Sequence, residues 1–292
     1  MSYQRREFLK LTGGLTSAIA FSSIAGNLGL SDTFFEERKK LKAFGLQLYS
    51  LRDVLPKDPQ GVLKQVASFG YKQIEGYEGP KGMFWGMSNT EFKKYMDDLG
   101  VNFISSHCDT NKDFEKKAAD ASAIGMKYLI YPYEGANKSI DDYKKLTDDF
   151  NKKGEICKKN GIRFAFHNHN FSFTAINGVF PQDVLMQNTD PSLVDFEMDM
   201  YWVVTPGQDP VAWLKKYPNR FPLVHVKDRT KGATAAADTC TLGEGSIDYP
   251  PLLKEARKQG VQYFIVEQEK YAGTTPIDSA KADAEYMKKV KV

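Results

Sequence analysis

Short apolar stretches recur along the chain from residue 44 onward, and stretches with a longer apolar period separate them. We expect each short stretch, rich in β-branched and aromatic residues, to form a buried strand. Eight strands are predicted on this basis: Phe44–Leu48, Lys72–Glu75, Asn102–Ser106, Tyr128–Tyr131, Arg163–His167, Leu193–Asp199, Pro222–Val226 and Tyr263–Glu267. Between most of them, apolar side chains stand three and four positions apart, as in residues 61–70 and 143–150, which predicts helices.

Several predicted helices end at a glycine that stands one to three residues before the next strand, as is typical of a helix C-terminus. These glycines are Gly70, Gly100, Gly125, Gly161 and Gly260. Strands that alternate with helices imply parallel pairing and right-handed crossovers. Eight such units in about 250 residues match the size of an α/β fold, the (β/α)8 TIM barrel. We therefore predict one barrel domain over residues 40–292.

An open, doubly wound sheet is the competing architecture. Such a sheet would place a Gly-x-Gly-x-x-Gly phosphate-binding turn after its first strand. Here the first predicted strand runs into Gln47–Asp53, a segment without glycine. The barrel is therefore the favoured fold.

The first 30 residues have a different character from the rest of the chain. Arg5 and Arg6 stand before a run of small and weakly apolar residues from Leu11 to Gly26. This arrangement resembles a twin-arginine export signal, and we predict such a signal over residues 1–30 and a periplasmic location. The alternative is an amphipathic N-terminal helix. Since no cysteine stands near the end of the run, we expect no stable membrane anchor after export.

Charge and cysteine content narrow the range of functions. The whole chain has 40 basic and 37 acidic side chains. Without residues 1–30 these numbers become 37 and 36, a net charge of +1, which argues against nucleic acid as a partner. The 3 cysteines stand far apart in the sequence and are predicted to be unpaired thiols. The sequence leaves a homo-oligomer open.

All 4 histidines stand at the carboxyl end of a predicted strand, where barrel enzymes carry their active sites. Five acidic residues occupy similar positions at other strand ends. The histidines are His107, His167, His169 and His225, and the acidic residues are Glu75, Glu197, Asp199, Glu267 and Glu269. Because charged groups are costly in buried parallel strands unless they are paired or bind a metal, this placement points to a site.

The last four predicted strands each bring a histidine or a carboxylate to the same rim. Nitrogen and carboxylate oxygen ligands suit a divalent metal such as Mn, Zn, Co, Fe or Mg. Strand alternation places His167 and His169 on one face, and likewise Glu197 and Asp199, so the choice within each pair stays open. The alternative interpretation is that each histidine is a core residue with satisfied hydrogen bonds and no metal.

Seven motifs in order resemble the xylose-isomerase-like TIM barrel superfamily, in particular its sugar phosphate isomerase/epimerase branch. They cover nearly all of the chain after residue 40. The motifs are Gly45–Asp53, Ile74–Tyr77, His167–Asn170, Glu197–Trp202, His225–Asp228, Gly243–Asp248 and Val266–Glu269.

The resemblance implies a role for individual residues. It implies metal ligands at His167, Asp199, His225 and Glu267. It places His107 and His169 in the sugar pocket, with Glu75, Trp202 and Lys227 nearby as further substrate-binding residues. Many family epimerases carry glutamate where this chain has His167, and they use two metal-bound glutamates as opposed acid and base. Since only Glu267 keeps that position here, we expect Glu267, His167 and His169 to share the proton transfer.

The reaction expected from this site is proton abstraction next to a carbonyl, in a metal-dependent sugar isomerase or epimerase. The alternative on the same metal site is a 3-keto-glycoside lyase, in which β-elimination follows the same proton abstraction. A third possibility of another class is a non-catalytic sugar-binding barrel. Because Asp199, His225 and Glu267 are all present, the sequence favours an enzyme with a small sugar, keto-sugar or glycoside as its substrate.

Overall fold

The computed structural model describes residues 41–233 and 235–292. Residues Leu41–Val292 group into one compact unit. The segment expected to direct export, residues 1–30, lies outside the described residues, so export stays a prediction.

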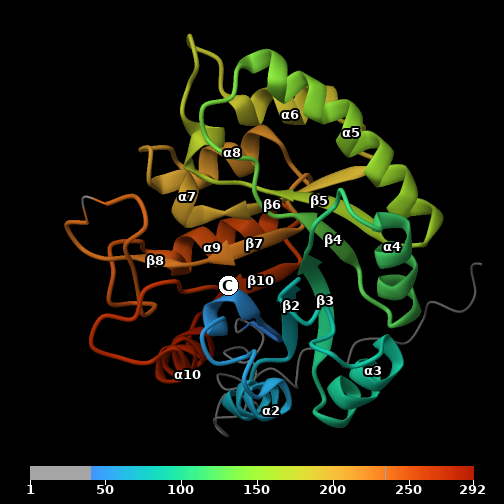
Figure 1. Cartoon of the computed structure of the whole chain (residues 1–292). Coiled ribbons are helices and arrows are strands. Elements are labelled where there is room, and N and C mark those ends of the chain that lie inside the picture. Colours follow the sequence, from blue (N-terminus) through green and yellow to red (C-terminus); the bar gives the residue numbers. More distant parts are fainter. Residues whose placement is uncertain (1–40, 234) are drawn as a thin grey trace, which may run out of the picture. The chain divides into compact units, whose positions relative to one another are not determined.

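Eight parallel strands form a closed barrel with the helices around it (Figure 1). Around the barrel the order is β1, β10, β7, β6, β5, β4, β3, β2, and this closure confirms the predicted (β/α)8 fold. The strands are β1 (Gly45–Gln47), β2 (Gln73–Tyr77), β3 (Asn102–His107), β4 (Tyr128–Tyr131), β5 (Arg163–His167), β6 (Val194–Asp199), β7 (Leu223–Val226) and β10 (Tyr263–Val266). Each agrees with its predicted range to within two residues at either end.

Helices connect successive strands along the outside of the barrel. They are α2 (Pro59–Phe69), α3 (Asn89–Asp98), α4 (Phe114–Ala123), α5 (Ile140–Lys159), α6 (Pro181–Asn188), α7 (Met200–Val204), α8 (Pro210–Lys216), α9 (Tyr249–Lys258) and α10 (Pro276–Met287), with short 3-10 turns η2 (Leu48–Leu51) and η3 (Asn170–Phe173). Among the described residues, none of the helices has the length and apolar character needed to cross a bilayer.

The five glycines expected at helix ends all have a positive φ, between 66° and 103°. A residue in this left-handed region lets the chain leave a helix and turn back toward the barrel. The largest value is 103° at Gly70, which directly follows α2. The predicted positions of these helix ends are therefore confirmed.

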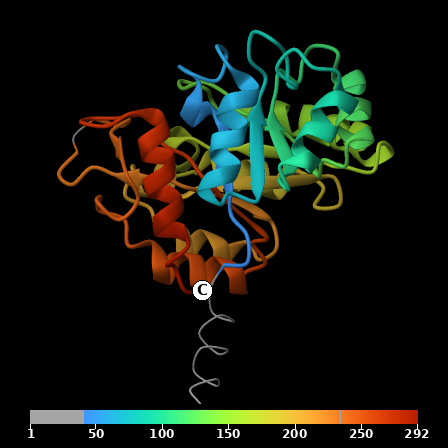
Figure 2. The same ribbon diagram turned by 90° about the horizontal axis from the view of Figure 1, so that it is seen from below.

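The first and last helices of the ring lie beside each other, which closes the outer layer (Figure 2). The phenol of Tyr71, just before β2, donates a 2.8 Å hydrogen bond to the carbonyl of Ala280 in α10. Tyr71 is fully buried, and its ring also contacts Phe44 at 5.2 Å between centroids. The two ends of the described chain are thus held together by apolar packing and a buried hydrogen bond.

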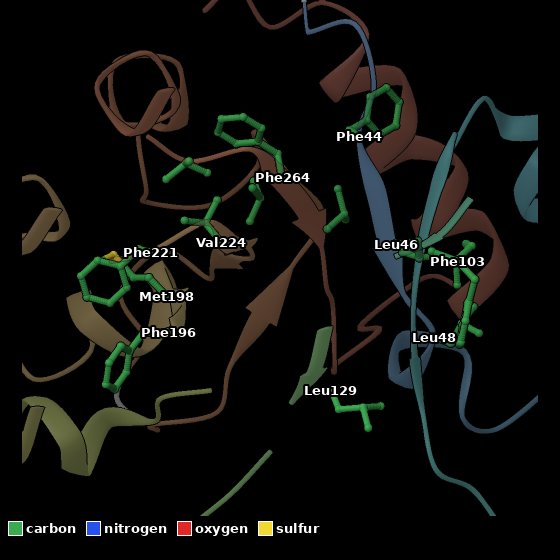
Figure 3. Packing of buried hydrophobic residues seen from close by; sticks show 14 of the residues in the cluster. Phe44, Leu46, Leu48, Phe103, Leu129, Phe196, Met198, Phe221, Val224 and Phe264 are labelled. Carbon is green, nitrogen blue, oxygen red and sulfur yellow. The ribbon is translucent and has the colours of Figure 1, made fainter. Parts of the chain in front are cut away.

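Alternation along the strands divides the side chains between two cores. The outward side chains pack against the helices, and Figure 3 shows Phe196 and Met198 of β6 beside Phe221. Burying each such phenylalanine contributes about 1.5–3 kcal/mol. A second, smaller cluster joins strands from across the barrel and so lies in its interior: Tyr128, Ile130, Ala165 and Leu223, with Tyr263 packed against them.

The same alternation places the candidate site residues inside the barrel. Ala165 and Leu223 face the interior, so His167, two positions after Ala165, and His225, two after Leu223, do so as well. Along β5 and β7, interior side chains therefore change from the apolar Ala165 and Leu223 to the polar His167 and His225 toward the carboxyl-terminal ends. This change in polarity marks the end of the barrel that holds the chemistry.

A short antiparallel pair, β8 (Asp228–Arg229) and β9 (Thr239–Cys240), follows β7 and was not predicted from the sequence. The buried Asp228 carboxylate accepts hydrogen bonds of 2.8–3.1 Å from four backbone N–H groups. These groups belong to Arg229, Gly243, Gly245 and Ile247. A side chain at Gly245 would collide with Asp228, because an added Cβ would lie 2.2 Å from its Oδ1. Asp228 thus fixes the segment that leads into α9.

Asp283 of α10 predicts how stability depends on pH. Its side chain is 1% exposed, and burial raises the pKa of Asp283 to about 8, with Asp228 and Glu244 adding to the effect. The folded state therefore holds this proton up to about pH 8, whereas the unfolded chain releases it near pH 4. The contribution of this protonated group to the free energy of unfolding is therefore fully present below about pH 4 and is lost as the pH rises toward 8.

We expect Asp283→Asn to raise the free energy of unfolding at pH 8 by up to about 5 kcal/mol and to have little effect at pH 4. Asparagine keeps the acceptor for the Leu242 N–H, which lies 2.8 Å from Asp283 Oδ1. Denaturant unfolding across this pH range is the measurement. Glu285→Gln, at an exposed position of the same helix, is the matched control. Parallel pH profiles for Asp283→Asn and the wild type would contradict the prediction.

Candidate active site

The carboxyl-terminal ends of the strands surround a cavity of about 570 Å³. Five residues expected from the sequence line it: His107, His167, His169, Lys227 and Glu267. The other lining residues are Tyr49, Tyr77, Glu78, Cys108, Asp109, Lys112, Pro132, Tyr133 and Glu269. The size and position of the cavity are those of a small-molecule site in a TIM barrel.

Asp199, His225 and Glu267 offer one ligand atom each, and Glu267 lines the cavity. The Nδ1 atom of His225 lies 3.2 Å from Glu267 Oε2 and 3.7 Å from Asp199 Oδ2. Ligands about 2.0–2.2 Å from a shared ion stand roughly 3–3.6 Å from one another, so this spacing fits a divalent metal. All three side chains are buried, and we refer to them as the metal triad.

Lys227 reaches the same carboxylates. Its Nζ lies 2.9 Å from Asp199 Oδ2, 2.7 Å from Glu267 Oε2 and 2.7 Å from Glu269 Oε1. Burial alone would lower the pKa of Lys227, but these three carboxylates raise it well above the ordinary value. The lysine is therefore a permanent cation beside the triad.

A second group of imidazoles and carboxylates adjoins the triad on the side of the barrel interior, and two of its members, His107 and His167, also line the cavity. Glu197 Oε2 is 2.8 Å from His107 Nε2 and 2.9 Å from His167 Nδ1, and His225 Nε2 is 2.6 Å from Glu75 Oε1. Four ligand atoms of this group, from His107, His167, Glu197 and His225, lie within 4.8 Å of one another, but their closest distances are those of charge-assisted hydrogen bonds. We therefore interpret this inner cluster as a hydrogen-bonded network that orients His225 from behind.

The charges of the inner cluster compensate one another. Burial alone would lower the pKa of His107, but Glu75 and Glu197 raise it to about 9, so this imidazole is protonated at neutral pH. Burial alone would raise the pKa of Glu75, but His107 and His225 lower it well below its ordinary value. Ionised Glu75 faces protonated His107 at 3.1 Å.

His167 connects the two groups. Its Nδ1 belongs to the inner cluster, whereas its Nε2 lies 3.9 Å from Asp199 Oδ2 of the metal triad. Burial lowers the pKa of His167 well below its ordinary value, and the positive charges of His225 and His107 lower it further, so its ring is neutral. A neutral Nε2 at this position keeps His167 as the predicted fourth ligand, outside the closely spaced triad.

His169 occupies an aromatic setting. Its ring lies 4.9 Å from Tyr133, 5.7 Å from Phe171 and 5.3 Å from Trp202, measured between centroids. Within residues 41–292, its Nδ1 is buried without a hydrogen-bond partner. Burial lowers the pKa of His169 to about 4, with Lys227 contributing, so the imidazole is neutral at neutral pH.

Glu75 and Trp202, expected to bind substrate, lie behind the cavity wall. Glu75 is fully buried and accepts hydrogen bonds from Gln47 at 2.8 Å and Ser105 at 2.6 Å. Trp202 is 6% exposed and packs against His169. Their contact with substrate stays a prediction, and their surroundings point to support of His225 and His169.

Sequence reasoning missed Gln47 and Ser105 as parts of the site. Gln47 donates to the Glu75 carboxylate and also accepts a 3.0 Å hydrogen bond from the Tyr49 N–H, which links the inner cluster to the cavity wall. Both residues are polar side chains at buried positions of strands. That is the signal by which they could have been found.

The comparison with known protein families agrees with the barrel fold. Residues 63–290 match the family model described as xylose isomerase-like TIM barrel. The chain belongs to the xylose isomerase-like TIM barrel family. Membership confirms the expected superfamily.

Individual relatives within the xylose isomerase-like family carry different descriptions. An inosose dehydratase of Clostridium perfringens is 30% identical over 212 residues, which cover 62% of this chain and 70% of that protein. A solved sugar phosphate isomerase/epimerase of Parabacteroides distasonis is 30% identical, with a TM-score of 0.73 over 86% of this chain and 96% of that one. A solved IolI protein with a bound zinc atom shares the fold at 13% identity, with a TM-score of 0.67 over 83% and 95%.

Proposed function

We propose that this protein is a divalent-metal-dependent lyase that eliminates a leaving group β to the ketone of a cyclic polyol or keto-sugar. The observation that carries the proposal is that the two candidate proton-transfer residues in the cavity, His169 and Glu267, differ in how strongly neighbouring side chains engage them. His169 is neutral and makes no side-chain hydrogen bond or ion pair within residues 41–292, whereas Glu267 is held by Lys227 and His225.

The metal triad supplies the ligands for the ion. Asp199, His225 and Glu267 would hold it, with His167 Nε2 nearest among the remaining donors. A bound divalent ion would polarise the substrate carbonyl and so acidify the neighbouring C–H bond. The residues of the chain then have to move that proton.

His169 is suited to take the proton. An uncharged imidazole beside the cavity can accept it from the carbon next to the carbonyl and return it to the departing oxygen. In this order of steps the C–H bond breaks first, a carbon–carbon double bond forms, and the C–O bond at the β-carbon breaks. Either water or an alcohol leaves, depending on the substituent.

Glu267 is less suited to act as a base. Against the effect of burial, Lys227 and His225 hold the pKa of Glu267 far below its ordinary value. Its Oε2 is already engaged by the Lys227 ammonium at 2.7 Å, and Glu267 is one of the three residues that would bind the ion. Epimerisation by two opposed bases needs a second group that gives and takes protons readily. We therefore place elimination before epimerisation, which reverses the order expected from the sequence.

The cavity favours an unphosphorylated substrate. Few basic residues near its rim are free to meet a phosphate. Lys227 is engaged by three carboxylates, and Arg229 donates to the carbonyls of Ala233, Ala235 and Ala236. Lys112 is the remaining lysine among the lining residues of the described barrel. Glu78, Asp109 and Glu269 add negative charge around the opening. A phosphate group would meet repulsion there.

The description of the dehydratase relative supports elimination, and that of the solved isomerase/epimerase keeps epimerisation as the second candidate. The test is incubation in deuterium oxide with Mn²⁺ and either an inosose or a 3-keto-glucoside. We expect loss of water or aglycone and an ultraviolet band from the unsaturated ketone. Deuterium incorporation without loss of a group would favour epimerisation, and no exchange on either substrate class would contradict both activities.

A further inference from the structure

Lys227 and the ion expected at the metal triad share the same two oxygen atoms. The ammonium lies 2.9 Å from Asp199 Oδ2 and 2.7 Å from Glu267 Oε2. Those are also the oxygens that face His225 Nδ1, at 3.7 and 3.2 Å. Lys227 is 1% exposed, so little solvent screens it from a neighbouring charge.

Two consequences follow from this sharing. The ammonium offsets the repulsion between the Asp199 and Glu267 carboxylates and so holds them together. The same ammonium repels a dication bound to these oxygens and competes with it for their lone pairs. Lys227 therefore holds the triad carboxylates together and at the same time lowers their affinity for a divalent ion.

We propose that Lys227 sets the affinity of the metal triad, and that its ammonium withdraws from Asp199 and Glu267 toward Glu269 when a divalent ion binds. This inference rests on the metal site of the proposed function. It goes further because it assigns to Lys227 control over ion exchange.

Glu269 is placed to receive the ammonium. Its Oε1 already lies 2.7 Å from Nζ, and its side chain is 24% exposed, more than that of Asp199 or Glu267. Its backbone is anchored on both sides, because its N–H donates to Thr239 Oγ1 at 3.0 Å and its carbonyl accepts from Arg52 at 2.8 Å. The ring of Trp202, 5.3 Å from Nζ, offers the cation a further favourable contact.

The test is calorimetric titration of the chelator-treated full chain with MnCl2 and with ZnCl2. We expect Lys227→Met to lower the dissociation constant at least tenfold and to enlarge the rise in Tm on adding the ion. Lys227→Arg, which keeps the positive charge, should remain within about threefold of the wild type. Glu269→Gln should weaken binding several-fold, because the ammonium then depends more on the two triad carboxylates and one negative charge is lost.

Lys153→Met is the matched control. Lys153 is also buried and bonded to a carboxylate, but its partners are Asp149 and Asn111, away from the triad. This variant should bind both ions with the wild-type dissociation constants.

The outcomes separate this inference from the metal site itself. Equal or weaker binding by folded Lys227→Met, or unchanged binding by Glu269→Gln, would overturn the role of Lys227 while leaving the site in place. Absence of ion binding by the wild type would overturn both. If Lys227→Met does not fold, the opposite shift expected for Glu269→Gln still decides the matter.

Discussion

Replacing Asp199 by asparagine is expected to lower kcat/KM by about a thousandfold, because the loss of one carboxylate ligand removes several kcal/mol of charge stabilisation by the ion. Asparagine preserves the fold locally, since it can still accept the 3.2 Å hydrogen bond from the Trp202 N–H that caps α7. The measurement pairs steady-state kinetics with metal analysis of the purified variant. We expect both activity and stoichiometric metal to be lost.

Asp195 provides the control for this substitution. It stands four residues earlier on β6, is buried, and pairs with Arg163 at the other end of the strand. Asp195→Asn should reduce stability but retain metal and most of kcat. Full activity of metal-depleted Asp199→Asn protein would show that the triad does not serve the reaction.

Replacing His169 by glutamine is expected to lower kcat by about 10²–10⁴-fold, because the base that takes the proton is lost. The dissociation constant for the metal should stay unchanged, since His169 stands outside the triad. Solvent deuterium exchange into the substrate is the direct readout, and it should slow in proportion to kcat.

Trp202→Phe is the matched control for His169, because it keeps an aromatic ring at the position that packs 5.3 Å from the imidazole. It should retain most of kcat. Normal exchange in His169→Gln, together with slow exchange in Glu267→Asp, would transfer the role of base to the carboxylate.

Periodicity along the chain predicted the barrel well. The apolar stretches are local signals, and each of the eight strands required only a few consecutive residues to be recognised. Glycines such as Gly70 and Gly260 predicted helix ends because a left-handed residue at that point has a steric cause independent of the tertiary fold. The short β8–β9 pair was missed, because two-residue strands carry too little pattern.

The site could be located but not resolved into its two groups from the sequence. Alternation placed Glu197 and Asp199 on one face without telling which would bind a metal. The structure separates them by depth: Glu197 bonds to His107 and His167, and Asp199 faces His225 Nδ1 and Lys227. Such distinctions depend on the stagger between strands, which brings residues as distant as Glu75 and His225 into contact.

The apolar cluster of Tyr128, Ile130, Ala165 and Leu223 fills the interior of the described barrel beneath the site, so the cavity is closed at that end. Tyr49 and Tyr133 line the cavity with exposed rings, and we expect substrate to enter and products to leave past this aromatic rim. An elimination yields two products from one substrate, so both must leave past that rim before the next molecule arrives. We expect product release through this opening to limit turnover at high substrate concentration, with the larger product competing with substrate for the cavity.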